Sequence, residues 1–340
     1  MLHARIPATP LLYEEIPAHA VNPRGRFKHV MALALNPQTG FRDGVIRCVT
    51  SREGDVSVAG FLDHSELHRV VSAGECQFEI GERLTLLGEQ ELLARIMPEG
   101  FECIGFEDPD LVQGDDGLLH LYFTVPLVCR AEWIFHIYLG HASGPDIDSL
   151  VMHEPVLMDP KRSAKELSAV PIASDGVYRH LIESNASGTE HSAYSTIRVA
   201  KERPDGWEFG ETIFHPAHGG IDWAGGHASP GPFVPRSFID VGEGKLLGFF
   251  NGREADRVER EQVVFGTFSV GLFIYDYEHG EIDWVSPQPF IQDSEATTIT
   301  FASQFVETAP GEGVLYAHVD DSFVRAYRIS ADAIQSLLPQ

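Results

Sequence analysis

The feature that most constrains the fold is a loose internal repeat of short strand–turn–strand units. Two copies are clear, namely DPDLVQGDDGLLHLYFTV at residues 108–125 and SAVPIASDGVYRHLIES at residues 168–184. In both, an apolar strand runs into an Asp-Gly turn and an alternating strand follows, which is the pattern of a β-hairpin. Further copies start at Ser229 and Phe301, and the least clear one covers residues 27–51, with its turn expected at Arg42-Asp43-Gly44.

Further short strands follow each hairpin, so that five units of about 68 residues divide the chain. A unit of that length can hold four short strands and their turns. Helical periodicity is confined to residues 66–71, 89–96 and 331–338, and the other connections are too short and Gly-rich for a parallel α/β fold. Radial repetition of four-stranded sheets predicts an all-β fold, a five-bladed β-propeller. A β-sandwich, or a pair of them, is the structural alternative.

We expect a single propeller domain over residues 1–340. Its blades are predicted at roughly 26–98, 99–160, 161–218, 219–292 and 293–330. The last unit lacks an evident fourth strand, and an N-terminal segment is expected to supply it and to close the ring.

Charge and hydropathy limit the partners. Fifty acidic and 25 basic side chains give a formal net charge of -25, which repels phosphate backbones and argues against nucleic-acid binding. The simplest reading of this charge is solubility. No stretch approaches the roughly 18–20 apolar residues of a membrane span, so no membrane partner is expected. The first residues show neither a long apolar run nor a cleavage-site pattern, which predicts a cytoplasmic protein.

Known motifs for metals, nucleotides and acyl transfer are missing. The 4 cysteines lack metal-type spacing, and the 16 histidines form no HExxH pattern. No G-x-S-x-G, P-loop or GxGxxG segment is present. We therefore expect no cofactor and no bound metal at the site, although a cation in the central channel and assembly into a homo-oligomer are both compatible with the sequence.

Residues 101–109, FECIGFEDP, carry two adjacent carboxylates, Glu107 and Asp108, after an apolar segment. In a partly desolvated pocket, a neighbouring like charge lets one carboxylic acid keep its proton to higher pH. General-acid catalysis of glycoside cleavage needs such a group. The structural alternative is that Asp108 caps the turn before Pro109 while Glu107 is solvated.

A second candidate is the Gly-rich segment GGIDWAGGHASPGPFVP at residues 219–235. Loops of this kind commonly carry function. Asp222 would supply a carboxylate, Trp223 a platform for a sugar ring, and His227 a hydrogen-bond donor. The alternative is a connection between blades with a structural tryptophan.

The start of the first strand in each blade lines the channel of a propeller. The residues at these starts are Glu107-Asp108, Lys165-Glu166, Gly226-His227 and Ser303-Gln304. The repeat therefore predicts that residues far apart in the chain meet at one mouth.

These segments resemble five-bladed propeller glycosidases, and among them family 130 of the glycoside hydrolases, the mannoside phosphorylases and β-mannosidases. GFEDPDLV is similar to the EDPR segment of that family, which implies that Asp108 is the general acid. KELSAVPIASDG is similar to its lysine-aspartate stretch, which implies that Lys165 lies near substrate or phosphate. The resemblance covers roughly residues 40–328.

Two further segments extend the resemblance. GIDWAGGHASPGPFVP is similar to the family's tryptophan-aspartate stretch, which implies that Asp222, His227 and Ser229 lie around the site. Arg47, in VIRCV, matches an arginine of the first blade. The sequence departs from the family at Asp110, where an arginine is expected, and this loss of a cation favours hydrolysis over phosphorolysis.

The preferred hypothesis is an inverting glycoside hydrolase that acts on an oligosaccharide or other glycoside. Asp108 protonates the leaving oxygen, directly or through a substrate hydroxyl, and a second carboxylate activates water. Asp222 is the first candidate for that base, followed by Glu166 and Glu183. The substrate-binding set comprises Glu107, Arg47, Lys165, Glu183, Trp223, His227 and Ser229.

Two other functions stay open at this stage. One is a glycoside phosphorylase that uses inorganic phosphate in place of water. The other is a propeller that binds sugars without catalysis. The sugar itself is not determined, because arabinose- and galactose-acting propellers of family 43 share the architecture.

Overall fold

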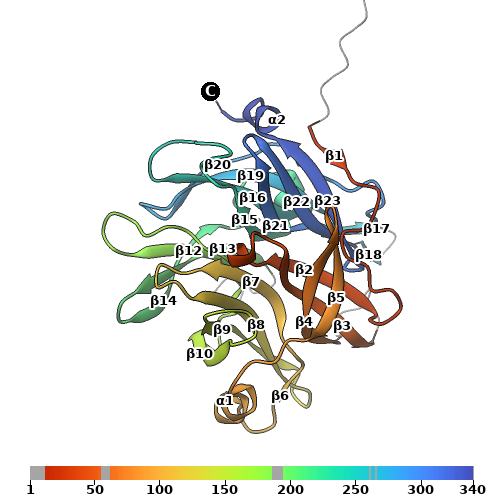
Figure 1. Ribbon diagram of the computed structural model, residues 1–340, viewed down its shortest axis with the longest axis vertical. Helices are drawn as coiled ribbons and strands as arrows, with labels where there is room; N and C mark the ends of the chain where they lie inside the picture. The colour runs from red at the N-terminus through yellow and green to blue at the C-terminus, as the bar shows by residue number, and fades with distance from the viewer. Residues whose placement is uncertain (1–11, 55–61, 186–193, 260–261, 265, 340) are drawn as a thin grey trace, which may run out of the picture.

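The computed structural model describes residues 12–54, 62–185, 194–259, 262–264 and 266–339. Residues 1–11, on which the prediction about a secretory signal depends, lie outside the described residues. The chain folds into five small antiparallel sheets arranged as the predicted five-bladed β-propeller (Figure 1). Among the described residues, no helix has the length and apolar character needed to cross a membrane.

Each blade is one sheet of strands that follow one another in the chain. The first blade contains β2 (His29–Leu35), β3 (Asp43–Glu53), β4 (Leu62–Gly74) and β5 (Gln77–Arg83). The second blade contains β6 (Glu102–Cys103), β7 (Glu107–Gln113), β8 (Leu119–Cys129), β9 (Ile134–Gly144) and β10 (Val151–Leu157). In this blade β6 and β7 both pair with β8. The third contains β11 (Lys165–Ser168), β12 (Tyr178–Asn185), β13 (Ser195–Arg203) and β14 (Gly206–Phe214).

The last two blades each depart from this simple order. The fourth contains β15 (His227–Phe233), β16 (Lys245–Arg253), β19 (Phe268–Asp276) and β20 (Glu281–Val285), with a separate hairpin of β17 (Arg257–Glu259) and β18 (Gln262–Val264) between β16 and β19. The fifth contains β21 (Thr300–Ala309), β22 (Glu312–Val319), β23 (Phe323–Ser330) and the N-terminal β1 (Glu14–Glu15).

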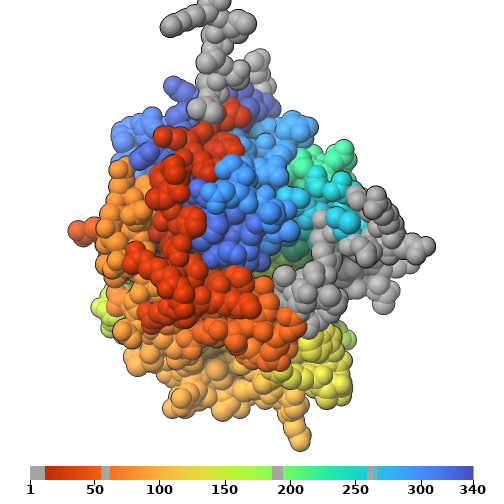
Figure 2. Space-filling model, turned by 90° about the vertical axis from the view of Figure 1, so that its right-hand side faces the viewer, coloured from red at the N-terminus to blue at the C-terminus, as the bar shows by residue number. Residues whose placement is uncertain are grey.

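The N-terminal segment closes the ring. Strand β1 pairs with β23, where Glu14 faces Arg328 and Glu15 faces Tyr327. Figure 2 shows the N-terminal residues, in red, lying against the C-terminal strands, in blue. The expected donation of a strand is therefore confirmed, and it covers the edge that β23 would otherwise leave unpaired.

The hairpin turns fall largely where the glycines predict them. Gly117 and Gly176 both adopt a left-handed φ of 82°, which glycine adopts without steric cost. The prediction of a turn at Arg42-Asp43-Gly44 is wrong, because Gly44 lies inside β3. A Cβ there would lie 2.1 Å from the carbonyl oxygen of Ala34, so the glycine permits a close strand approach. The chain reverses earlier, at the 3-10 helix η1 (Pro37–Thr39), which ends at Gly40.

Two of the three expected helical segments are helices. They form α1 (Glu89–Ile96) and α2 (Ala331–Gln335), and a second 3-10 helix, η2, covers Asp222–Ala224. The expectation for residues 66–71 is wrong, because they belong to β4. This segment pairs with β3 on one side and β5 on the other, and such tertiary pairing overrides a weak local preference.

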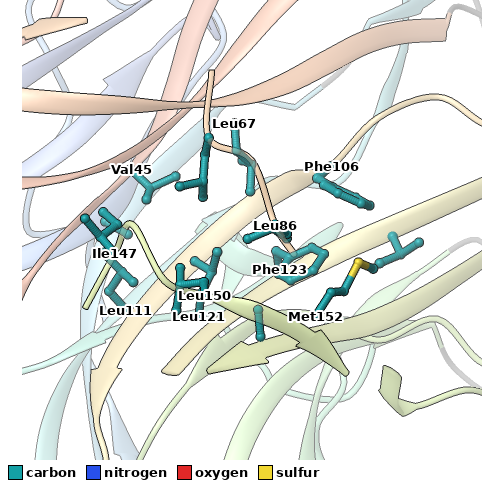
Figure 3. Close-up of a cluster of buried hydrophobic side chains, with 14 of the residues drawn as sticks. Val45, Leu67, Leu86, Phe106, Leu111, Leu121, Phe123, Ile147, Leu150 and Met152 are labelled. Atoms are coloured by element: carbon teal, nitrogen blue, oxygen red, sulfur yellow. The ribbon is translucent and has the colours of Figure 1, made fainter. Parts of the chain in front are cut away.

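Apolar side chains pack between neighbouring blades. The largest buried cluster joins Val45 and Leu67 of the first blade to Leu121 and Phe123 of the second (Figure 3). Burial of this kind is the main favourable term that fixes one blade against the next. The innermost strands are thereby held in a closed ring around the channel, in the order β2, β7, β11, β15 and β21.

The pairing register shifts in all five innermost strands, and in three of them the β-bulge contains a left-handed residue. In these three, the register shifts between Met31 and Leu33 in β2, between Glu107 and Asp110 in β7, and between Lys165 and Ser168 in β11. In each bulge one non-glycine residue has a left-handed φ: Ala32 at 49°, Asp108 at 47° and Glu166 at 53°. Consecutive side chains of a regular strand point to opposite faces, and a bulge re-aims them.

Candidate functional site

A cavity of about 320 Å3 opens where the innermost strands begin. All five blades contribute to its wall, which combines charged side chains with an apolar rim. The residues that line it are Met31, Arg47, Leu62, Asp63, Ile104, Glu107, Asp108, Pro126, Phe135, Ile137, Lys165, Glu166, Glu183, His227, Phe268, Ile299, Phe301, His318 and Asp321. The predicted convergence of distant segments at one mouth is thus observed.

The bulges determine which side chains reach this cavity. Glu107 and Asp108 are neighbours in the chain, yet both line it, as do Lys165 and Glu166 in the next blade. A regular strand would turn one member of each pair away. In this arrangement both Asp108 and Glu166 have a left-handed backbone, a conformation that costs a non-glycine residue on the order of 1–2 kcal/mol.

Arg47 joins the two adjacent carboxylates of the second blade. Its Nη2 lies 2.5 Å from Glu107 Oε1, and its Nη1 lies 2.9 Å from Asp108 Oδ1. Thr124 donates a hydrogen bond of 3.2 Å to the other oxygen of Asp108. Burial disfavours the Arg47 charge, but Glu107 and Asp108 outweigh it and raise the pKa of Arg47 above its usual value. One guanidinium therefore faces two carboxyl groups, which leaves the trio an excess of negative charge when both are ionised.

The carboxyl groups near Asp108 are shifted toward the protonated state. Burial, and then the Asp108 charge, raise the pKa of Glu166 well above its usual range. The same causes raise the pKa of Asp110, and burial likewise raises that of Glu107. A buried carboxyl with a like charge beside it keeps its proton at higher pH.

A second cluster keeps Glu183 ionised. Lys165 Nζ and His227 Nε2 lie 3.0 and 3.1 Å from Glu183 Oε1. Burial alone would raise the pKa of Glu183, but His227 and Lys165 outweigh it and lower the pKa below its usual range. The cavity thus contains one carboxyl group, Glu166, that favours its proton and another, Glu183, that favours the charge.

Asp321 is a second carboxylate that the cavity holds ionised. His318 Nε2 lies 3.2 Å from Asp321 Oδ1, while its Nδ1 accepts a hydrogen bond of 3.4 Å from the Ala32 backbone. Burial disfavours the Asp321 charge, but His318, Arg47 and Arg52 outweigh it and lower the pKa of Asp321. Its side chain is 29% exposed, so water can reach it.

Most of the predicted site residues meet in this cavity, and three do not. Arg47, Glu107, Asp108, Lys165, Glu166, Glu183 and His227 line it. Asp222 lines a separate surface depression formed with residues of the segment 216–225 and with Glu254, Ala255 and Arg257. Ser229 is fully buried in β15 and donates a hydrogen bond of 3.4 Å to the Pro230 carbonyl.

Trp223 lies in the hydrophobic core. It is 7% exposed, and its indole N–H donates to the Ser286 carbonyl at 3.1 Å. A Cβ at Gly252 or Gly271 would lie 2.5 or 2.3 Å from its ring, so the two glycines make the space that the indole fills. Trp223 is therefore a structural tryptophan of the core, and it does not form a platform in the cavity.

Sequence reasoning missed Asp63, His318 and Asp321. Asp63 lines the cavity and forms a bidentate pair with Arg52 at 2.6 and 2.7 Å. Asp321 follows Asp320 in the turn between β22 and β23, where two aspartates look like ordinary turn residues. Asp320 does have that role, since it accepts bonds from the backbone of Thr297, Thr298 and Ile299. The different role of its neighbour could not be read from residue type.

Within the described residues, no group of three or more His, Cys, Asp or Glu side chains has an arrangement that could hold a metal ion. Five carboxyl groups of the cavity are instead paired with Arg47, Arg52, Lys165 and the two histidines, namely those of Asp63, Glu107, Asp108, Glu183 and Asp321.

Comparison with known proteins relates the chain to several carbohydrate-active enzymes through its fold. No family model matches the sequence, and no curated protein matches it. The β-1,2-mannobiose phosphorylase of Listeria innocua, in complex with β-1,2-mannobiose, superposes with a TM-score of 0.63 at 13% identity, covering 96% of this chain and 99% of that one. A glycosyl hydrolase from Bacteroides ovatus gives a TM-score of 0.61 at 16% identity, covering 95% and 91%.

A third solved structure is MPT-4, a mannose phosphorylase from Leishmania mexicana in complex with a phosphate ion. Its TM-score is 0.52 at 14% identity, and 96% of this chain and 87% of that one are covered. These likenesses confirm the remote resemblance to five-bladed propeller glycosidases and phosphorylases at the level of the fold. Fold does not by itself determine reaction or substrate.

Proposed function

We propose that the protein hydrolyses a glycosidic bond with inversion, using Asp108 as the general acid. The observation that carries this proposal is the cavity itself. It gathers six carboxyl groups from four blades, namely those of Asp63, Glu107, Asp108, Glu166, Glu183 and Asp321. Carboxyl groups whose surroundings push their pKa values apart are the usual basis of acid–base glycoside cleavage.

The acid would come from the Asp108 side of the cavity. Asp108 is buried, is oriented by Arg47 and Thr124, and neighbours Glu166, whose pKa is raised by burial and by Asp108. The raised pKa of Glu166 keeps a proton in this part of the cavity, from which Asp108 can receive it. That proton would be delivered to the leaving oxygen, directly or through a substrate hydroxyl.

The base would be one of the two carboxylates whose pKa is lowered in the cavity. Asp222 is not in the cavity, so the candidates are Glu183 and Asp321. Glu183 already faces Lys165 and His227, whereas Asp321 faces His318 and is open to water. An inverting enzyme needs room for a water molecule between base and sugar, and this requirement favours Asp321.

A glycoside phosphorylase is the second candidate, and the fold similarity to two phosphorylases favours it. The charge of the cavity argues against it. Both cations that line the wall, Arg47 and Lys165, are already in ion pairs with carboxyl groups. Asp110, near Asp108, supplies no cation where the family resemblance implies an arginine. Among the described residues that line the wall, a phosphate dianion would therefore meet no Arg or Lys that is not already paired with a carboxyl group.

The experiment is product analysis on manno-, arabino- and galacto-configured oligosaccharides, with and without phosphate. Hydrolysis predicts free reducing sugar, phosphate independence, and an initial anomer opposite to that of the substrate by NMR. Formation of a sugar phosphate would show phosphorolysis instead. Binding without turnover, unaffected by Asp108→Asn, would identify a sugar-binding propeller.

A further inference from the structure

The turn between β8 and β9 stands at the rim of the cavity and presents an exposed tryptophan. In β8, Thr124 faces Glu107 at the level of the carboxyl groups. Pro126, further along β8, and Phe135, at the start of β9, both line the cavity wall. The turn of residues 130–133 connects the two strands just beyond these residues. It therefore continues the cavity wall outward.

Trp133 is the residue of this turn that faces solvent. Its side chain is 46% exposed, and the neighbouring Ile134 is 40% exposed. The Trp133 ring meets the Phe135 ring edge-on, with 5.6 Å between centroids. Phe135 in turn packs on the buried Leu62, Ile104 and Val128. An aromatic surface thus runs from the cavity wall to an open indole face.

The turn keeps a tryptophan where its backbone favours a glycine. Trp133 has a φ of 56°, in the left-handed region that a bulky side chain rarely adopts. Residues with such strained backbones persist where the surrounding structure holds them, and they cluster at active sites and ligand-binding sites. Burial offsets little of the strain here, because almost half of the ring is in water.

Exposed ion pairs link the turn to strands on both sides. Arg130 pairs with Glu53 at the end of β3 and with Glu102 in β6. The guanidinium thereby joins the turn to the neighbouring blade and to its own. The Trp133 ring itself packs edge-on against Phe135, so it can bind a ligand face with little further ordering.

We propose that Trp133 is the platform of a distal sugar-binding subsite, which accepts a pyranose ring of an extended oligosaccharide. This inference rests on the proposed function and specifies its substrate class. The cavity volume of about 320 Å3 is at the small end of the range for ligand sites. A substrate longer than a few units therefore has to leave the cavity over its rim, and an indole face is a suitable apolar support for a sugar ring.

The first test measures turnover against chain length for wild type, Trp133→Gly, Trp133→Phe and Ile172→Ala. Ile172 is 47% exposed, lies outside the cavity, and serves as the matched control. For Trp133→Gly we expect kcat/KM on hexamers to fall roughly tenfold through KM, with less than about twofold change on dimers. Trp133→Phe should recover part of the loss. Equal losses on dimers and hexamers, or no loss, would overturn the inference.

The same variant separates binding from folding. Glycine removes the left-handed strain, so the melting temperature of Trp133→Gly should stay unchanged or rise while hexamer affinity falls. A lower melting temperature together with proportionally reduced activity on every substrate would indicate a structural role. A change of oligomeric state in analytical ultracentrifugation would show that the indole contacts a second copy, and would also overturn the proposal.

A binding measurement tests the subsite independently of catalysis. Hexamers of the manno, arabino and galacto series are titrated calorimetrically into wild type, Asp108→Asn and the double variant Asp108→Asn/Trp133→Gly. If wild type shows no turnover but the double variant binds the preferred hexamer about tenfold more weakly than Asp108→Asn, the subsite stands and the hydrolase proposal fails. If no hexamer binds to wild type, both fail.

Discussion

The first blade and the two that follow it share one backbone device but present different side chains with it. Each innermost strand bulges at the same step, and the bulged residue is left-handed in all three. In the first blade that residue is Ala32, which has no functional group. In the second and third it is Asp108 and Glu166, whose carboxyl groups line the cavity. Since Ala32 shares the strained φ, the strain belongs to the blade, and the chemistry depends on the side chain.

The strand that pairs with each innermost strand also presents a different side chain in each of the three blades. The residues that face Met31, Glu107 and Lys165 across the sheet are Arg47, Thr124 and Glu183. The same position therefore supplies a cation and an anion to the cavity wall in the first and third blades, and in the second a buried hydroxyl that donates to Asp108. Repetition of the blade places these groups near one another, and their different types make an electrostatically asymmetric site.

The largest expected effect is on turnover. Asp108→Asn should reduce the kcat of glycoside cleavage by about 10^2–10^4-fold, because an amide cannot deliver the proton. Ala32→Gly, at the matching position of the first blade, should leave kcat within about twofold. Initial rates on the best substrate of the panel provide the measurement. Similar losses in the two variants would mean that the bulge, rather than the carboxyl group, determines activity.

A large effect on stability is expected at Glu183. Glu183→Gln leaves the Lys165 charge without its counter-charge and removes the carboxylate that His227 faces, which should lower the free energy of unfolding by about 3 kcal/mol at pH 7. The pKa of Glu183 is lowered in the folded state, so its stabilisation is present above the unfolded pKa and is lost as the pH falls through the folded value.

Urea unfolding at pH 7 and at acidic pH checks this expectation. The difference between wild type and Glu183→Gln should shrink as the pH falls. Glu208→Gln, which removes an exposed partner of Arg203, is the control and should change little. A difference that grows toward acidic pH would contradict the assignment of Glu183 as the ionised carboxylate.

Glu166 should show the opposite pH dependence. Its pKa is raised in the folded state by burial and by Asp108. Above the unfolded pKa the unfolded chain loses this proton more readily than the folded one, so wild-type stability should fall as the pH rises through that window. Glu166→Gln removes the group that titrates, and its stability relative to wild type should increase from pH 4 to pH 8. Parallel stability curves for the two proteins would refute the raised pKa.

The smallest effect is expected for the stability of Ala32→Gly. Relief of the left-handed strain is worth about 1–2 kcal/mol, against about 0.8 kcal/mol for a buried methyl group and 0.5–1 kcal/mol for the greater freedom of the unfolded chain. The terms nearly cancel, so the urea midpoint should correspond to a change below about 1 kcal/mol. A larger loss would show that the Ala32 methyl has a packing role that Asp108 and Glu166 do not share.

The local features of this protein were predictable because they depend on neighbours in the chain. Alternating strands, the turns at Gly117 and Gly176, and the EDP segment with Glu107 and Asp108 are visible in the sequence. Period-two patterning and glycine conformations act over a few residues, which is why the propeller could be predicted. The prediction of a turn at residues 42–44 was wrong because Gly44 permits a close contact between two strands, which the local pattern does not reveal.

What only the tertiary structure decided is which side chains meet and what charge each one carries. Asp222 and Trp223 lie in a Gly-rich segment of the kind that often forms a binding loop. Asp222 is nevertheless outside the cavity, and the Trp223 ring fills the space beside Gly252 and Gly271. Asp321 enters the site from the last blade, and Glu183 is ionised because Lys165 and His227 reach it from other strands. Convergence and pKa depend on distances between segments far apart in the chain, and those distances are set by how the blades pack.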